Sequence, residues 1–205
     1  MMIYPKLKLG LTISKGNEIL EHRPMVDAHS WVRNFYNHYT FLAGAFLKDA
    51  TTFSDGKMNL KDTSGSVFTE TSSTSHCFRI DTAGAGTESW GIVVGTGSTA
   101  VTIDDYILQT RTAHGTTSGK ISYAAATATT ASWVGGIVTE TLVRYFNNNS
   151  GDTLEITESG IYGYFWNTVA VWKYVMICRD VFAAASIPDA AQLKMVYEVT
   201  FDVSP

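Results

Sequence analysis

The chain has 205 residues, a formal net charge of -4 and a charged fraction of 17%. That fraction lies below the value of about 25% that is typical of soluble domains, and Thr, Ser, Gly and Asn take the place of the missing charge. Because Lys and Arg are scattered in an acidic chain, the sequence excludes a basic stripe that follows a phosphate backbone, and we expect no nucleic-acid partner. A surface poor in charge is instead typical of a protein that is packed among protein neighbours, since burying a charge is costly.

The sequence also limits the compartment and the covalent chemistry. Residues 1–13 alternate Lys with apolar residues, so we expect no signal peptide and synthesis in a host cytoplasm. The most apolar segment, Val169–Cys178, is shorter than the roughly 18 residues of a membrane helix and contains Lys173, so we expect no membrane partner. Cys77 and Cys178 lack a metal-binding or redox spacing; they predict two buried thiols, with a single disulfide as the alternative.

Residues 1–48 predict a hairpin followed by a helix. Apolar residues at every second position indicate a half-buried first strand: Leu7, Leu9, Leu11 and Ile13. A turn at Lys15–Asn17 and a return strand from Glu18 complete the hairpin.

The helix is predicted from Asp27 to about Leu47. Its apolar residues recur at steps of three and four: Trp31, Phe35, Tyr39, Leu42 and Phe46. Asp27 and Ser30 are both candidate N-caps. An aromatic face of this kind favours packing on a sheet, and we expect hairpin and helix together to form a docking element.

The rest of the chain predicts many short strands. Residues 49–75 are polar and are interpreted as a long surface loop with room for a short ribbon. Strand patterns follow at His76–Ile80, Trp90–Val94, Ala100–Ile107, Lys120–Ala126, Ser132–Phe146, Thr153–Thr157, Gly160–Trp166, Val169–Cys178 and Gln192–Val203. Gly135-Gly136 inside one of them indicates a bulge or bend. We therefore expect one domain over residues 1–205, a mainly β antiparallel sandwich of jelly-roll type.

No motif in the chain indicates catalysis. Gly95-Thr96-Gly97-Ser98 is incomplete both as a nucleophile elbow and as a phosphate loop, and it predicts a tight turn. A glycosidase would need two of the acidic residues in the strand region to face each other, and we expect them to be solvated or to act as caps: Asp104, Asp105, Glu140, Glu155 and Glu158. We therefore expect no catalytic residue and no enzyme activity, with polysaccharide hydrolysis as the weakest alternative.

Metal and sugar binding are the remaining chemical options. The histidines show no zinc-ligand spacing, and Asn149–Asp152 is a poor match to a calcium loop, so we expect no metal and no cofactor. Tyr162, Tyr164 and Trp166 would lie on one face of a strand, either in the core or as a platform for a sugar ring. Trp133 and Trp166 are therefore the candidates for glycan stacking.

Three segments carry a resemblance to a known class of protein. Gly91–Leu108 combines an apolar strand, Gly-Thr-Gly, small polar residues and Asp-Tyr-Ile-Leu, and it is similar to a pattern in tail and virion proteins of tailed bacteriophages. Ser30–Phe35 after an N-terminal hairpin, Ile177–Phe182 and the terminal strand Leu193–Val203 resemble pieces of the same proteins. The resemblance implies a virion component.

The sequence therefore favours a structural subunit on the tail, neck or capsid exterior of a phage particle. Its expected partners are other virion proteins and copies of itself. The candidate interface residues are Trp31, Phe35, Tyr39, Trp133 and Trp166. The alternative is a glycan-binding module of a phage fibre or adhesin that recognises the host.

Overall fold

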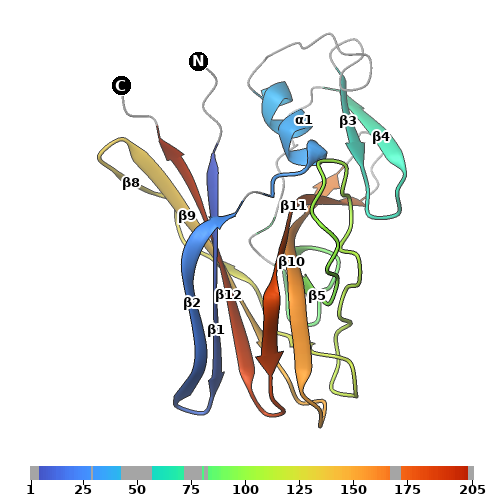
Figure 1. Cartoon of the computed structure of the whole chain (residues 1–205). Helices are drawn as coiled ribbons and strands as arrows, with labels where there is room; N and C mark the ends of the chain where they lie inside the picture. The colour runs from blue at the N-terminus through green and yellow to red at the C-terminus, as the bar shows by residue number, and fades with distance from the viewer. Residues whose placement is uncertain are drawn as a thin grey trace.

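The computed structural model describes residues 5–28, 30–42, 57–71, 80, 83–166 and 172–202. Two antiparallel sheets face each other as layers, and the helix lies at one end beside a two-stranded ribbon (Figure 1). The elements are β1 (Lys6–Lys15), β2 (Glu18–Ala28), α1 (Arg33–Leu42), β3 (Lys57–Lys61), β4 (Val67–Thr71), β5 (Gly91–Gly95), β6 (Ser122–Tyr123), β7 (Thr127–Ala128), β8 (Ser132–Val134), β9 (Ile137–Asn147), β10 (Leu154–Trp166), β11 (Trp172–Ile187) and β12 (Gln192–Asp202). No helix in these ranges has both the length and the apolar character needed to cross a bilayer.

The larger sheet has the order β2-β1-β12-β9, and the short strands β6, β7 and β8 pair along β9. The smaller sheet has the order β11-β10-β5. The named strand pairs in both are antiparallel. The predicted antiparallel sandwich with an N-terminal hairpin is therefore confirmed, while the jelly-roll topology stays a prediction.

The core lies between the two sheets, as the alternating patterns predict. Each second residue of β1 and of β12 points inward, so Leu9 and Tyr197 are paired across the strands and both are buried. The phenol of Tyr197 crosses to the smaller sheet, where it hydrogen-bonds to the Ser159 hydroxyl and donates to the Asp180 carboxylate at 3.0 Å. The layers are thus joined by a buried polar contact as well as by apolar packing.

The helix begins later than the sequence predicts. Asp27 is part of β2, and the chain then pairs with the edge of β11, where the Ser30 carbonyl accepts from the Arg179 amide at 3.0 Å. The Val32 amide in turn donates to the Ile177 carbonyl at 3.1 Å. The predicted helix start and both predicted N-caps are therefore wrong, because backbone pairing at a sheet edge outweighs the local helix signal. The predicted end at Leu47 lies outside the described residues.

The middle of the chain also differs from the prediction. The predicted loop 49–75 contains the ribbon β3–β4, and its other parts lie mostly outside the described residues. The predicted strand Ala100–Ile107 is wrong, because this segment is a loop, and Lys120–Ala126 shrinks to β6. The Gly95–Ser98 segment is not a tight turn either, because it leaves β5 without reversing.

Gly135-Gly136 is a hairpin turn, whereas the sequence predicted a bulge or bend. The two glycines have φ angles of 58° and 82°, and they join β8 to β9. Positive φ at both central residues is the requirement of a type I′ turn, which glycine meets without strain.

A buried arginine on β9 ties two loop segments and the strand β5 of the smaller sheet to the inner face of the larger sheet. The Arg144 side chain has no exposed surface, and its donors reach five backbone carbonyls at 2.7 to 3.3 Å. These carbonyls belong to Gly84, Thr87, Trp90, Ile92 and Ala124. A planar guanidinium with five N–H groups is the only side chain that can satisfy five acceptors at once.

Replacing Arg144 by Met should lower the free energy of unfolding by about 3–5 kcal/mol, because five buried carbonyls lose their donor. Urea denaturation followed by fluorescence measures the loss. The control is Arg111→Met, which removes a partly exposed ion pair to Glu88 and should cost about 1 kcal/mol or less. Equal losses in the two variants would contradict the assigned role of Arg144.

Candidate interaction surface and buried polar sites

A buried carboxylate organises the loop that follows β5. Glu158, on β10, has no exposed surface and accepts hydrogen bonds from the backbone amides of Gly97, Gln109 and Thr110 at 2.7 to 3.1 Å. The amides come from both ends of one long loop, so a single carboxylate closes it. The prediction that this acid is solvated or a cap is wrong for Glu158, since loop backbone replaces water around it.

Arg179 neutralises Glu158 from the neighbouring strand β11. Its Nε lies 2.9 Å from a Glu158 oxygen, its Nη1 lies 2.8 Å from Asp105, and its Nη2 donates to the Thr99 carbonyl at 3.2 Å. Burial raises the pKa of Asp105, but the Thr102 amide and hydroxyl and the Arg179 guanidinium outweigh it and leave this pKa below its ordinary value. Both acids are among the five acidic candidates that the sequence predicts to be solvated or to act as caps, and the structure brings these two together on one arginine as structural anions.

The Gly-Thr-Gly segment is explained by this close approach. A Cβ on Gly95 would lie 2.7 Å from a Glu158 carboxylate oxygen, and one on Gly97 would contact the same oxygen more closely still. Any side chain there would displace the carboxylate, so glycine is required at both positions.

The variant Glu158→Gln should lower the free energy of unfolding by about 3–5 kcal/mol, because it leaves Arg179 buried without its central counter-charge. The neighbouring Glu155 is exposed on the same strand. Glu155→Gln is therefore the matched control and should have an effect near zero. Chemical denaturation of both variants checks this, and a Glu158→Gln protein as stable as the control would refute the buried-anchor assignment.

The other acidic candidates do not form a pair. Asp104 is exposed and lies 2.6 Å from the Nε of Arg33, whose hydrogen bond and charge lower the pKa of this carboxyl. Glu155 is exposed on β10, and Glu140 is partly buried on β9 in the other sheet.

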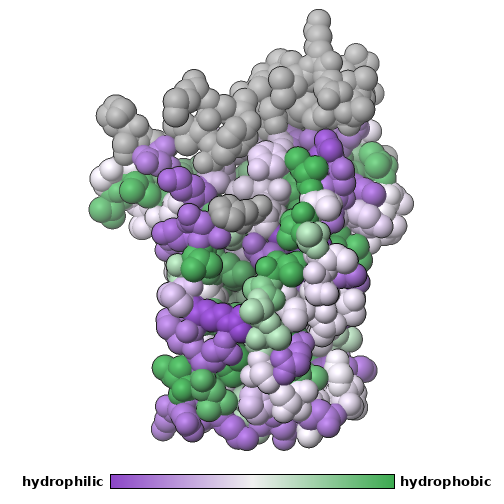
Figure 2. All heavy atoms as spheres, viewed as in Figure 1, coloured by the Kyte–Doolittle hydropathy of each residue, from purple (hydrophilic) through white to green (hydrophobic). Residues whose placement is uncertain are grey.

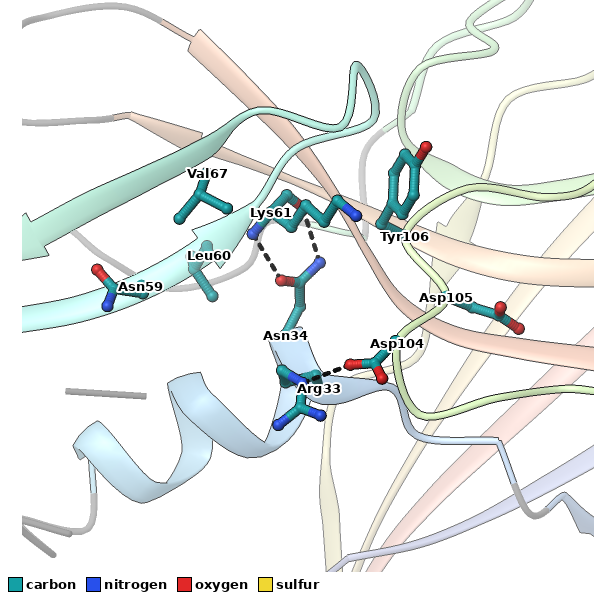
Figure 3. A pocket seen from close by; sticks show the side chains of 9 residues that line it. All are labelled: Arg33, Asn34, Asn59, Leu60, Lys61, Val67, Asp104, Asp105 and Tyr106. Atoms are coloured by element: carbon teal, nitrogen blue, oxygen red, sulfur yellow. Dashed lines mark hydrogen bonds and ion pairs between the residues drawn. The ribbon is translucent and has the colours of Figure 1, made fainter. Parts of the chain in front are cut away.

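A small pocket of about 200 Å³ lies where the ribbon, the helix start and the loop before Ile107 meet (Figure 3). Its polar groups are engaged with one another. The Asn34 amide pairs with both backbone groups of Lys61 at 2.9 Å, and the Lys61 ammonium lies 3.8 Å from the centre of the Tyr106 ring. Arg33 bonds Asp104, while the Asp105 carboxylate points away from the pocket (Figure 3). These contacts hold the ribbon, the start of the helix and the loop before Ile107 together.

Asp62 fastens the ribbon β3–β4 to β11. One carboxylate oxygen accepts from the amides of Ser64 and Ser66 at 3.0 Å each, and the other lies 2.9 Å from the Lys173 ammonium. Burial raises the pKa of Asp62, but hydrogen bonds from Ser64, Lys173 and Ser66 outweigh it, so this pKa lies below its ordinary value.

A carboxyl with a lowered pKa stabilises the fold above about pH 4 and loses that contribution as the pH falls through its folded value. Asp62→Asn should therefore cost about 1–3 kcal/mol at neutral pH, and the gap to the parent protein should shrink in acid. Unfolding measured at both pH values tests this, with the exposed Asp152→Asn as control. A gap that does not change with pH would contradict the assignment.

The most exposed apolar side chains of the described surface lie at the end of the β8–β9 hairpin. Trp133 is 73% exposed and Val134 is 74% exposed, with Ile137 across the turn at 42%. The hairpin diverges from the smaller sheet at this end (Figure 1), and an apolar patch lies over it (Figure 2). These side chains make the hairpin end the candidate interaction surface of the described chain.

Three of the predicted interface residues form one aromatic stack. The Trp31 and Phe35 rings are 3.8 Å apart and nearly parallel, and Phe35 and Tyr39 follow at 5.8 Å. Phe35 belongs to the core, while Trp31 and Tyr39 are half-buried, so the stack holds α1 on the sandwich.

Of the remaining aromatic candidates, Tyr162 is buried and Tyr164 is partly buried, while the Trp166 side chain lies outside the described residues. Trp166 ends β10, and its side chain lies outside the described residues. The Tyr162 hydroxyl is buried and accepts from the Leu108 amide at 2.6 Å, and Tyr164 packs edge-on against Trp90 and Trp172 at 4.4 and 4.7 Å. The structure therefore places two of the three residues of this motif among protein neighbours.

The predicted buried thiols and the predicted absence of a metal can be compared with the structure only within the described residues. Cys178 is a buried free thiol, and burial raises its pKa; Cys77 lies outside the described residues. Within the described ranges no group of three His, Cys, Asp or Glu could hold a metal ion. The predicted absence of a cofactor stays a prediction.

Comparison of the chain with protein-family models, with curated proteins and with solved structures gives no match.

Sequence reasoning found Trp133 but missed what surrounds it. Val134 and Ile137 fit an alternating strand, and only the geometry of the glycine turn shows that they end in solvent. The run Trp-Val-Gly-Gly-Ile was the available signal, because two glycines between apolar residues are typical of a hairpin turn.

Proposed function

We propose that this chain is a structural subunit that works by assembly with other protein chains. The observation that carries the proposal is the hairpin end, where about three quarters of the surface of Trp133 and of Val134 is exposed. Burying a large apolar side chain is favourable by about 1.5–3 kcal/mol, and tryptophan is the residue most enriched in energetically dominant interface positions. A folded chain that holds such residues on a hairpin turn presents a ready contact site.

The interior supports the same proposal. The acids that could have served catalysis hold loops instead: Glu158 and Asp105 bind Arg179, and Asp62 binds Lys173. These contacts stiffen the segments around the sandwich, and a rigid surface loses little conformational entropy when it docks.

The similarity of Gly91–Leu108 to tail and virion proteins supports a tailed-phage particle as the setting. We therefore propose a position on the tail, neck or capsid exterior, with other virion proteins and copies of the chain as partners. In this proposal the protein is made in the host cytoplasm, is incorporated into the virion, and needs no cofactor and no active site.

Particles produced without this protein should lack a discrete density or fail to assemble, as seen by electron microscopy. Supplying Trp133→Ser in place of the parent chain should reduce incorporation, because the hairpin loses its largest apolar contact. Ile19→Ser is a matched control, since Ile19 is 66% exposed in the β1–β2 hairpin at the other end of the sandwich.

Complete, fully decorated particles in the absence of the protein would contradict the proposal. Equal losses for Trp133→Ser and Ile19→Ser would contradict the assigned role of the hairpin.

The exposure of Trp133 also favours one alternative, a glycan-binding module in which the indole face stacks on a sugar ring. A glycan array separates the two functions. An assembly protein gives no signal that depends on Trp133, whereas a binding module loses its signal in Trp133→Ala.

A further inference from the structure

The β8–β9 hairpin ends in an uncharged apolar projection. No charged residue occurs between Ile121 and Thr139, so β8, the turn and the first three residues of β9 are neutral, and the nearest charge on β9 is Glu140. Gly135 and Gly136, both at positive φ, form the two-residue turn at its tip. Its tip can therefore enter a cavity without carrying a charge out of water.

A cavity of suitable character lies at the start of the same sheet. It has a volume of about 320 Å³ and is lined by Pro5, Lys6, Leu7, Asp27, Ala28, Trp31 and Tyr36. Its aromatic wall is held in place, since the Trp31 indole donates to the Pro5 carbonyl at 2.9 Å and stacks on Phe35. Pockets of about 300–1,000 Å³ hold organic groups the size of an indole ring or larger.

The projection and the cavity lie at one level of the larger sheet. Trp133 is paired with Val138, and Val138 with Phe201. Because Lys6 is paired with Thr200, Phe201 stands opposite Pro5, which lines the cavity. Three strand spacings separate β8 from β1, or about 14 Å, which is farther than one side chain reaches. A chain cannot fill its own cavity with its own Trp133, and a second chain can.

We propose that Trp133 of one copy seats in the cavity beside Trp31 and Tyr36 of another copy, so that the chain associates with itself through this contact. The inference rests on the proposed function, which it deepens by naming the partner and the two surfaces.

The chemistry of the two surfaces matches. The indole ring packs on aromatic neighbours at favourable offset or edge-on geometry, and its N–H needs one acceptor when it is buried. The Asp27 carboxylate, which belongs to an exposed residue of the lining, is such an acceptor. Val138, paired with Trp133, shares its face of the ribbon, whereas Val134 and Ile137 form the opposite face.

Each chain carries one projection and one cavity, which constrains the assembly. Two chains can exchange hairpins in a symmetric dimer, or several can close head to tail into a ring. In both arrangements every chain uses two contacts. A chain without the projection still has the cavity, and a chain with the cavity filled still has the projection.

The experiment uses two variants of the full chain, Trp133→Ser without the projection and Ala28→Arg with a long side chain in the cavity. Analytical ultracentrifugation and native mass measurement of each protein, alone and mixed, give the number of chains. The parent protein should self-associate, and each variant alone should do so at least about 30-fold more weakly, the effect of truncating a dominant interface residue. The mixture should form a two-chain complex that grows no further. Ile19→Ser should behave like the parent, and circular dichroism confirms that each variant is folded.

Two results would overturn the inference. If Ala28→Arg self-associates like the parent while Trp133→Ser does not, two hairpins bind each other and the cavity is not their partner. If Ala28→Arg fails to fold, a second variant that fills the cavity, Ala28→Gln, takes its place. Self-association of Ala28→Gln at the parent level would likewise show that the cavity does not bind the hairpin.

A parent chain that stays monomeric at all concentrations also overturns the self-docking inference. If that monomer is still incorporated into particles through Trp133, the proposed structural function stands with a different protein as partner. Failure of incorporation together with a monomeric chain would remove both.

Discussion

The contact on which the rest of the structure depends is the buried pair of Glu158 and Arg179, 2.9 Å apart between adjacent strands. Burying two charges is unfavourable unless every remaining donor and acceptor is used, and here they are used to hold backbone. Glu158 receives three amides of the long loop after β5, and Arg179 reaches its middle through Asp105 and Thr99. Without this pair, the amides of Gly97, Gln109 and Thr110 would lose the acceptor that holds both ends of the loop. Arg144 plays the same part for the loops on the facing sheet, where its five donors meet carbonyls and no acid.

Much of the sheet structure could be predicted from alternation alone. β1 and β12 repeat apolar residues at every second position, and they pair over nearly their whole length. The irregular half could not be predicted, because its determinants are distant in sequence. Glu158 lies 61 positions from Gly97. Alternation places Glu158 in phase with the buried Leu154 and Ile156, and Glu155 out of phase, but nothing local indicates that loop amides and Arg179 satisfy the buried carboxylate. The helix start failed for a related reason: Ser30 has a good capping side chain, yet its backbone pairs with a strand far along the chain.

Only part of the candidate surface could be predicted from the sequence, because the exposure of a side chain depends on which distant residues pack against it. An exposed tryptophan and a core tryptophan look alike in sequence, since both sit in apolar strands. Trp133 and the half-buried Trp31 differ only in what packs against them. The glycine pair after Val134 carries the missing information, because it turns the chain back before another layer can cover it.

The buried ionisable side chains and the exposed apolar side chains have different roles in this structure. Ionisable side chains in the interior are committed to loops, so their charges cannot serve a partner. The hairpin end presents apolar area to another molecule. Such a surface favours a binding site that is itself apolar and preorganised. The cavity beside Pro5 presents the aromatic rings of Trp31 and Tyr36 together with Lys6 and Asp27, and it is repeated on every copy of the chain. In the proposed self-association, the projection and the cavity belong to the same folded body, so two copies can close a symmetric dimer or several copies can join head to tail.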